Sequence, residues 1–598
     1  METNGHPDGT PERHEVREHD VLIVGAGGAG LRAAIAAAER GLSVGVVSKS
    51  LLGKAHTVMA EGGIAAAVGN VDPDDGWRTH FMDTMKSGKF LNNWRMVEIF
   101  AKEAPDRVIE LEQWGGLFNR TNEGKISQRA FGGHTYRRLC HVGDRTGLEM
   151  IRTLQEKVLA IDAKVYMETT ITKLLKSGDR VVGAVGYTRD LGKFIHFKAK
   201  AVVMATGGWG RIYKVTSNSW EGTGDGAVLG FEAGAELVDM EMVQFHPTGM
   251  VWPPGVRGLL VTEGVRGEGG VLRNSEGERY MENYDPEKME LSTRDVVARA
   301  NFTEVTEGRG SEHGGVLLDI THLGYNGIMK KLPTMYEQFL KLADIDISKE
   351  PMEVFPTIHY TMGGIKVEAE TGATNVPGLF AAGECAGGLH GANRLGGNSL
   401  SDLLVFGRRA GEGAAEYVKS NSYSTEIEAS EVEDEMKRLL EPLQKPESDD
   451  DENPFTIQKE LQSATMEHAN MMRNEESLKE GLEKVLALKE RLPNIRVQGT
   501  PLFNPGWHAA RDVYYMVQVS EIIFRCAIER REQRGAQWRL DYEGQDEELG
   551  KINFIVKKDQ QGEVGIEKRE IAPMPEHLAE LFGEEEMVGD QADAGAAG

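Results

Sequence analysis

Residues 21–50 read VLIVGAGGAGLRAAIAAAERGLSVGVVSKS. The first apolar run predicts a strand at 20–24, and the glycine cluster at 25–30 predicts a turn. The alanine-rich stretch predicts a helix up to about residue 40, and the second apolar run predicts another strand at 43–48. This βαβ unit has the spacing G-x-G-x-x-G at Gly25, Gly27 and Gly30. The three glycines permit, in turn, a tight turn, the approach of a pyrophosphate to the backbone, and close packing of helix on strand. The segment therefore predicts a dinucleotide-binding site.

The end of the second strand bears on which dinucleotide binds. An NAD site needs an acidic residue there for the ribose hydroxyls, but this chain has Ser48 and Lys49. That departure weakens the case for NAD and leaves FAD open. The candidate cofactor-binding residues of this unit are Gly25, Gly27, Gly28, Gly30, Ser48 and Lys49.

Further apolar segments that end in glycine predict a nucleotide-binding domain interrupted by an insertion. AVVMATGG (201–208) follows a strand-rich stretch at 180–200, and VPGLFAAGECAGG (376–388) comes much later. After about residue 420, charged residues alternate with Leu, Met and Val at helical spacing. We expect an α/β fold with a Rossmann-like FAD-binding domain, an α+β capping domain, a helical domain and a small C-terminal domain. The expected boundaries are a disordered tail at 1–18, the discontinuous FAD-binding domain at 19–240 and 356–420, the capping domain at 241–355, the helical domain at 421–540, and the C-terminal domain with a disordered tail at 541–598.

The charge balance argues against nucleic acid as a partner. The chain of 598 residues has 68 basic and 94 acidic residues, a formal charge of −26. Such a surface repels phosphate backbones. An anionic substrate must therefore be held by a local group of basic residues.

Cysteine usage and hydropathy limit what the chain can do alone. Its three cysteines, Cys140, Cys385 and Cys526, have no metal-ligand spacing, which argues against a disulfide framework and fits a reducing compartment. Without a CxxC motif, an iron–sulfur cluster would have to lie on another protein. We find no apolar run long enough to span a bilayer and no leader-like N-terminus, so we expect membrane association only through a partner.

Ten short segments identify a family when they are taken together and in order. They resemble the succinate dehydrogenase/fumarate reductase flavoprotein family, and most of all its succinate dehydrogenase members. The segments are GAGGAG (25–30), KAHTVMAEGG (54–63), QRAFGGH (128–134), ATGG (205–208), TGDG (223–226), QFHPTG (244–249), TEGVRGEGG (262–270), RDVVAR (294–299), HYTMGGI (359–365) and HGANRLGGNSL (390–400). RGAQWRLDY (534–542) extends the likeness, with Gln537 where His is more usual.

The resemblance implies FAD as the cofactor, attached covalently through His56. An imidazole bonded to the flavin ring withdraws electron density and raises the flavin potential, which makes a weak reductant such as succinate oxidisable. Backbone N–H groups at Ser399 and Leu400, at an expected helix start, would favour negative charge on the reduced ring. The other expected cofactor contacts are Thr57, Gly63, Ala205, Thr206, Gly207, Asp225 and Glu384.

The resemblance also implies a clamp for a four-carbon dicarboxylate. Arg394 and His359 would hold one carboxylate, and His246 and Thr262 the other. Phe131 would pack against the substrate. Binding between such groups could twist one carboxylate of fumarate out of conjugation and favour hydride addition.

Three further residues match the family's proton-transfer chain. Arg294 would exchange a proton with a substrate carbon, and Glu263 and Arg266 would pass it onward. An arginine is a poor free base, so a role as a relay member suits it better.

The implied function is succinate oxidation to fumarate, with electrons passed to an iron–sulfur subunit. Membrane-anchor subunits with a quinone and, as a further expectation, haem would hold the complex at the cytoplasmic face of a membrane. The alternatives are a fumarate reductase that runs the reaction backwards and, less favoured, an L-aspartate oxidase, which typically reads GANRMASNSL where this chain has GANRLGGNSL. A non-catalytic FAD-binding scaffold would be expected to have lost the clamp residues. Glu61 stands where dehydrogenases often have Gln and fumarate reductases Glu, so its charge could bias the direction.

Overall fold

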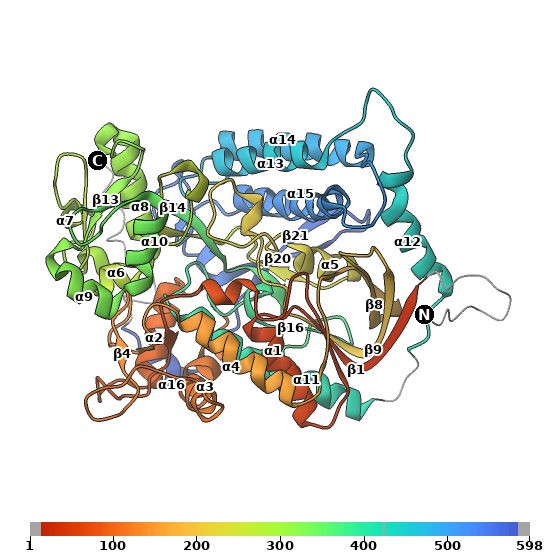
Figure 1. Ribbon diagram of the computed structural model, residues 1–598, viewed down its shortest axis with the longest axis horizontal. Helices are drawn as coiled ribbons and strands as arrows, with labels where there is room; N and C mark the ends of the chain where they lie inside the picture. Colours follow the sequence, from red (N-terminus) through yellow and green to blue (C-terminus); the bar gives the residue numbers. More distant parts are fainter. Residues whose placement is uncertain (1–13, 422–424, 584–598) are drawn as a thin grey trace.

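The computed structural model describes residues 14–421 and 425–583, and its largest sheet has seven strands (Figure 1). Five of them run parallel, and an antiparallel hairpin extends one edge. The strand order is β6 (Lys164–Tyr166), β2 (Val44–Val47), β1 (Glu15–Val24), β9 (Phe194–Met204), β8 (Arg180–Thr188) and β7 (Thr169–Ser177), with β16 (Leu379–Ala381) paired to β9.

The first βαβ unit confirms the predicted order of strand, glycine turn, helix and strand. Helix α1 (Gly28–Glu39) lies so close to the turn that a Cβ atom on Gly30 would come within 1.9 Å of the carbonyl oxygen of Gly25. The predicted tail at 1–18 is too long, because β1 begins at Glu15 and pairs with β9 from that residue. The first six residues of β1 are almost all polar and none of them is buried, so their hydrophobicity gives no strand signal. Residues 1–13 lie outside the described residues.

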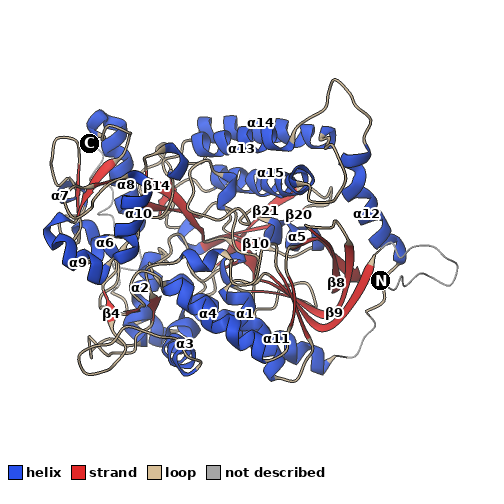
Figure 2. Cartoon of the chain, in the orientation of Figure 1, coloured by secondary structure: helices blue, strands red, loops and turns tan. Residues whose placement is uncertain are grey.

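A second sheet and its own hydrophobic cluster lie at the left of Figure 2. Buried Val265, Leu318 and Val354 belong to this cluster, which is separate from the main core. The strand order is β11 (Val243–Met250), β14 (Met352–Thr361), β13 (Val316–Asp319) and β12 (Val271–Arg273). The helices of this region are α6 (Gly264–Gly267), α7 (Met281–Tyr284), α8 (Arg294–Glu304), α9 (Gly324–Lys331) and α10 (Pro333–Ala343).

Two helices follow each other closely within residues 324–343. Helix α9 ends at Lys331, and α10 begins at Pro333. Proline suits the first position of a helix because its missing N–H would have no partner there. The break at Leu332 follows from that preference.

Long helices follow in the C-terminal third, along the top and the right-hand side of Figure 1. They are α12 (Ala429–Gln444), α13 (Pro454–His468), α14 (Glu475–Arg491) and α15 (Pro505–Glu529). Helix α15 is the most buried, and its Val517, Phe524 and Cys526 belong to the main hydrophobic core. The helical region therefore shares a core with the nucleotide-binding sheet.

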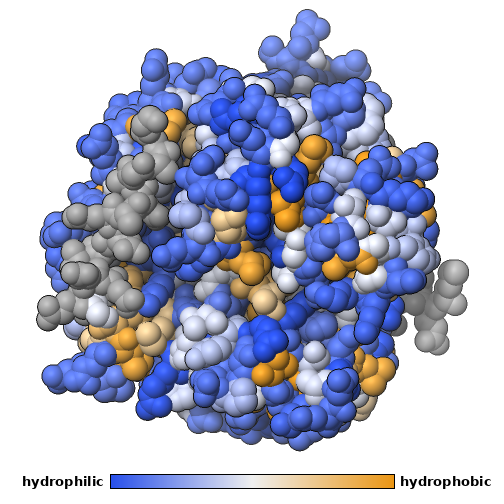
Figure 3. Space-filling view, turned by 90° about the vertical axis from the view of Figure 1, so that its left-hand side faces the viewer, coloured by the Kyte–Doolittle hydropathy of each residue, from blue (hydrophilic) through white to orange (hydrophobic). Residues whose placement is uncertain are grey.

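The other helices pack around the main sheet or support the cofactor cavity. They are α2 (Trp77–Ser87), α3 (Trp94–Gln113), α4 (Thr146–Ala160), α5 (Asp225–Ala233), α11 (Asn398–Ser420) and α16 (Glu576–Ala579). A small sheet joins β3 (Ile64–Ala65), β5 (Leu139–Cys140) and β4 (Gln128–Arg129). The face in Figure 3 is mainly hydrophilic and carries only small, separate apolar groups.

The last strands of the chain extend a sheet that begins near the middle of the sequence. The order is β17 (Ala386–Gly387), β15 (Gly364–Lys366), β10 (Leu237–Val238), β20 (Ile552–Lys558) and β21 (Val564–Glu570). Phe554 and Val556 are buried in the main core. The C-terminal segment thus pairs with β10, the strand that comes just before β11 in the sequence. The tail predicted at the end of the chain falls on residues 584–598, outside the described residues.

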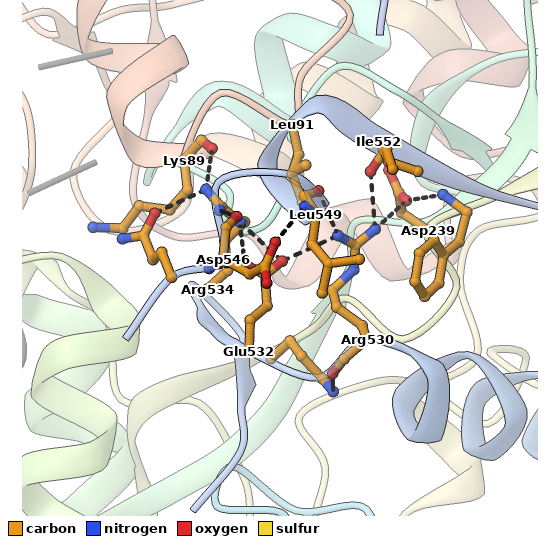
Figure 4. Close-up of polar contacts among 12 residues, drawn as sticks. Lys89, Leu91, Asp239, Arg530, Glu532, Arg534, Asp546, Leu549 and Ile552 are labelled. Carbon is orange, nitrogen blue, oxygen red and sulfur yellow. Dashed lines mark hydrogen bonds and ion pairs between the residues drawn. The ribbon is translucent and has the colours of Figure 1, made fainter. Parts of the chain in front are cut away.

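A buried network of charged residues holds the C-terminal segment against the residues that follow β10. Arg530, at the end of α15, contacts Asp239 at 3.1 Å and Glu532 at 3.2 Å, and it also pairs with Glu241. Arg534 binds the other side of Glu532 at 2.9 Å. Figure 4 shows Glu532 between the two arginines, with Asp239 beyond Arg530. Removing one partner of such a network leaves uncompensated buried charge.

We expect Arg530→Met to lower the free energy of unfolding by about 3–5 kcal/mol, because it leaves Asp239, Glu241 and Glu532 with too few partners. Urea unfolding followed by circular dichroism measures the change. Arg525→Met is the matched control, since Arg525 is about one-third exposed on α15 and its partner Glu521 keeps a second cation, Lys489, at 2.8 Å, so the change should cost less than about 1 kcal/mol. Equal effects of the two substitutions would contradict the importance of the network.

Candidate functional site

Most of the predicted cofactor residues line one long cavity. It begins at the carboxyl ends of β1 and β2 and continues past the start of α11. The lining residues are Gly25, Gly27, Gly28, Ser48, Lys49, His56, Thr57, Ala205, Thr206, Gly207, Asp225, Glu384, Ser399 and Leu400. Gly30 and Gly63 do not line it, and Gly30 instead makes the helix–strand contact described above.

The walls of this cavity bring backbone close to a ligand and include one unpaired hydroxyl group. Gly25 has φ +116°, and a Cβ atom there would lie 2.1 Å from the carbonyl oxygen of Ala205. Helices α1 and α11 both begin at the cavity, with Gly28 and Ser399 in their first turns. The buried hydroxyl of Thr206 has no hydrogen-bond partner among the described residues. A phosphate-rich dinucleotide such as FAD fits these donors.

Two predicted cofactor residues contact each other. The ammonium group of Lys49 lies 2.8 Å from Asp225 and 2.9 Å from Asp512 on α15. Lys49 also donates to the hydroxyl of Thr223. Asp512, a residue of the helical region that no local pattern indicates, therefore pairs with a lysine of the cavity wall without lining the cavity itself.

His56 lies in a short helical turn at the cavity wall. Its Nε2 is 3.1 Å from the amide nitrogen of Asn218, and its Nδ1 accepts from the backbone N–H of Ser219 at 3.3 Å. Burial lowers the pKa of the imidazole, against the opposing effect of Glu221. A neutral ring nitrogen, the form that can act as a nucleophile, is thus favoured at neutral pH.

Beside the cavity, Gln244 joins the two arginines predicted for substrate binding and proton transfer. Its side-chain oxygen accepts from Arg294 at 3.3 Å and from Arg394 at 3.1 Å. Its amide nitrogen donates to the backbone oxygen of Arg394 and to Asn393, both at 2.7 Å. Sequence reasoning missed this role, although the residue opens the motif QFHPTG.

Arg394 connects this cluster to the cofactor cavity. It donates to the hydroxyl of Ser399 at 3.2 Å, and its guanidinium lies 4.3 Å from the ring centre of Tyr360, another cavity-lining residue that sequence reasoning missed. Burial and the nearby Arg294 lower the pKa of Arg394 to about 9. Arg394 therefore remains charged at neutral pH.

His246 and His359 form the opposite side of the cluster. Their ring centres are 5.1 Å apart, and His359 lines the cofactor cavity. Burial lowers the pKa of both rings well below the usual value, so they act as neutral hydrogen-bonding groups. Thr248 contacts His246 and donates to the carbonyl oxygen of Val261 at 2.7 Å, which ties β11 to the loop that holds buried Thr262.

Arg294, Glu263 and Arg266 are in contact, as expected of a relay. The Nε of Arg294 donates to Glu263 at 2.7 Å, and Arg266 lies 3.6 Å from the same carboxylate oxygen. Burial opposes ionisation of Glu263, but the two arginines outweigh it and lower its pKa to about 2. The carboxylate is thus ionised throughout the physiological pH range.

Phe131 lies between the cofactor loop and the Arg394 loop. A Cβ atom on Gly62 would come within 2.6 Å of its ring, and one on Gly396 within 2.8 Å. Phe131 is 3% exposed. It closes the apolar side of a cluster whose other members are charged or polar.

Comparison with known proteins agrees with this geometry. The family signature described as FAD binding domain matches residues 20–400, and that described as Fumarate reductase flavoprotein C-term matches residues 458–580. The chain belongs to the succinate dehydrogenase/fumarate reductase flavoprotein family. The family interconverts succinate and fumarate.

Individual members of this flavoprotein family match over most of their length. A subunit of the fumarate reductase (CoM/CoB) of Methanothermobacter marburgensis is 47% identical over 88% of this chain and 95% of that protein. The succinate dehydrogenase flavoprotein subunit of Coxiella burnetii is 42% identical over 89% of this chain and 93% of that protein. The solved structure of Mycobacterium smegmatis Sdh1 in complex with UQ1 superimposes with a TM-score of 0.85, at 52% identity, over 94% of this chain and 95% of the other.

The surroundings of Glu61 disfavour its negative charge. Burial and the nearby Asp144 raise its pKa well above the usual value, and Arg129 opposes them only in part. One carboxyl oxygen has no hydrogen-bond partner among the described residues. The group therefore stays protonated over a wider pH range than an exposed glutamate. This weakens the idea that a fixed negative charge on Glu61 biases the direction of the reaction.

We expect Gln244→Leu to raise the KM for dicarboxylate by about 10–100-fold, because two charged donors lose their shared acceptor and shift in position. Steady-state kinetics of fumarate reduction with an artificial electron donor measure the effect. Gln462→Leu removes a comparable amide far from the site and should leave the KM within twofold. An unchanged KM in Gln244→Leu would show that this residue does not position the arginines.

Proposed function

We propose that this chain is the catalytic flavoprotein subunit of a succinate dehydrogenase, which oxidises succinate to fumarate. The observation that carries the proposal is the buried cluster of Arg294, Arg394 and the two histidines beside the cofactor cavity. Its electrons would pass to an iron–sulfur subunit.

The charge of the cluster suits a dianion. The guanidinium groups of Arg266, Arg294 and Arg394 face the single carboxylate of Glu263, which leaves a formal charge of +2 in a chain whose total is −26. Two carboxylates of one small molecule would balance it. Arg394 can bind one carboxylate in bidentate fashion, and neutral His246 and His359 can donate hydrogen bonds without adding charge.

Arg294 is suited to move a proton to or from a substrate carbon. In succinate oxidation it would accept the substrate proton as it gives one of its own N–H protons to Glu263, so that it stays a guanidinium. Arg266 would continue the path away from the substrate. A bound FAD supplies the hydride acceptor for the adjacent carbon. Phe131 and the buried walls exclude water from the reacting carbons.

We also propose that His56 bonds covalently to FAD. The support is its place in the cavity wall, its lowered pKa, the hydrogen bond that its Nδ1 accepts from Ser219, and the contact of its Nε2 with the side chain of Asn218. Attachment would withdraw electron density from the flavin and make succinate a sufficient reductant.

The proposed assembly has an iron–sulfur subunit together with membrane-anchor subunits that hold quinone and haem, at the cytoplasmic face of a membrane. The Mycobacterium smegmatis relative was solved in complex with UQ1, which supports electron transfer toward a quinone. Among the described residues, no helix of this chain has the length and apolar character to cross a bilayer, so the anchor is assigned to partners.

The alternative is a fumarate reductase that runs the same steps in reverse. The similarity to the CoM/CoB fumarate reductase of Methanothermobacter marburgensis favours it, while the likeness to the Coxiella burnetii protein favours succinate oxidation. Turnover of the purified assembly with a quinone and succinate, and with a quinol and fumarate, decides between them.

We expect His56→Ala to release all its FAD when the protein is precipitated with acid, because no covalent bond remains. The wild-type chain should retain flavin fluorescence in the denatured band after electrophoresis. His313→Ala, which changes a histidine paired with Glu353 far from the cavity, should retain it too. Complete release of FAD from the wild-type protein would refute the covalent link.

We expect Arg294→Gln to lower succinate–fumarate interconversion by about 10²–10⁴-fold while FAD stays bound, because the proton-transfer group is lost. Dye-coupled assays in both directions and the flavin absorbance measure the two effects. Arg299→Gln, on the same helix but paired with Asp295, is the matched control and should remain active. Substantial turnover in Arg294→Gln would show that Arg294 is not the proton-transfer residue.

A further inference from the structure

A second cavity lies outside the catalytic site, among α12, α14 and α15. Its volume is about 430 Å³, within the range of small-molecule sites. Leu439, Trp507 and Tyr514 are among the lining residues that make much of its surface apolar or aromatic. Trp507 is held in place by a hydrogen bond from its ring nitrogen to the carbonyl oxygen of Leu439 at 2.6 Å.

The same cavity gathers positive charge. Arg438, Lys489 and Arg511 line it, against a single acidic lining residue, Glu441. Arg438 pairs with a carboxylate at 2.6 Å, and Lys489 with another at 2.8 Å. Arg511 has no carboxylate within 4 Å in the described part of the chain.

Arg511 is therefore the unusual member. It is 7% exposed, and buried arginines are normally paired with an acid. Its Nε donates to the hydroxyl of Tyr515 at 2.8 Å and its Nη2 to the carbonyl oxygen of Thr172 at 3.1 Å, while Nη1 has no partner among the described residues. The rings of Tyr514 and Tyr515 hold the guanidinium, with centres at 4.4 and 4.2 Å.

Acceptors around Arg511 are in short supply. The carbonyl oxygen of Thr172 is shared by Arg511, by the hydroxyl of Tyr515 at 3.2 Å and by Arg438 at 3.5 Å. One carbonyl oxygen cannot fully satisfy three donor groups, so these donors can still bind a further acceptor. An anion in the cavity would supply the missing acceptor and balance the charge of Arg511.

We propose that this cavity binds a small organic anion with one carboxylate or phosphate head and an apolar body. The head contacts Arg511 and Arg438, and the body packs against Trp507, Tyr514 and Leu439. The site is separate from the catalytic one, because the next residue of α15, Asp512, pairs with Lys49 in the wall of the cofactor cavity. Helix α15 thus lies between the two cavities.

Titration calorimetry of the full-length flavoprotein, saturated with succinate, tests the proposal. The probes are 4-phenylbutyrate, 4-phenylbutyl phosphate and the neutral 4-phenylbutanol, which share one body and differ in the head. We expect at least one anion to bind with a Kd of about 1 mM or lower, and the alcohol at least tenfold more weakly. The tighter of the two anions identifies the head group.

Two variants locate the binding. Arg511→Gln should weaken it at least tenfold, and Ala510→Trp should abolish it by filling the cavity while Arg511 stays in place. Arg525→Gln, on the same helix outside the cavity, should bind within twofold of the wild type. Equal binding of the alcohol, no binding of either anion up to about 10 mM, or unchanged binding in Ala510→Trp would each overturn the proposal.

Discussion

Buried positive charge is the constraint on which the catalytic site depends. Arg266, Arg294 and Arg394 are all nearly inaccessible to water, and Glu263 is the carboxylate that pairs with two of them, Arg266 and Arg294. Guanidinium groups in such surroundings must be fixed by hydrogen bonds, and Gln244 holds two of them at once. If the proposed dicarboxylate binds here, its partners are already held in place before it arrives, which limits the reorganisation needed on binding.

This charge lies where two parts of the chain meet. The smaller sheet and its helices supply His246, Thr262 and Arg294, and the nucleotide-binding part supplies Arg394 and Phe131. Strand β14 belongs to the smaller sheet but ends at the cofactor cavity, where His359 and Tyr360 line the wall. The cofactor and the substrate groups are thus held by continuous elements of structure, which suits a reaction that needs fixed distances between them.

The sequence predicted the βαβ unit, the helical region and most residues of the site, because each carries a local signal: glycine spacing, helical periodicity or a recognisable motif. It did not predict contacts that join distant segments. Asp512 on Lys49 and Asn218 on His56 have no local pattern, and neither does Gln244 as a link between arginines. The early start of β1 was missed for a related reason, since its first residues are polar and only pairing with β9 makes them a strand. Roles in catalysis and covalent attachment are properties of the chemistry and stay predictions.

The contact between Lys49 and Asp512 has a consequence for biosynthesis. The cofactor cavity begins in the first fifty residues, but Lys49 in its wall pairs with Asp512 of α15, in the last sixth of the chain. Segments emerge from the ribosome in order and fold as they appear. Lys49 lacks one of its two ion-pair partners until α15 has been made and docked, so the charge at this point of the cavity wall is balanced only after the helical region has been synthesised.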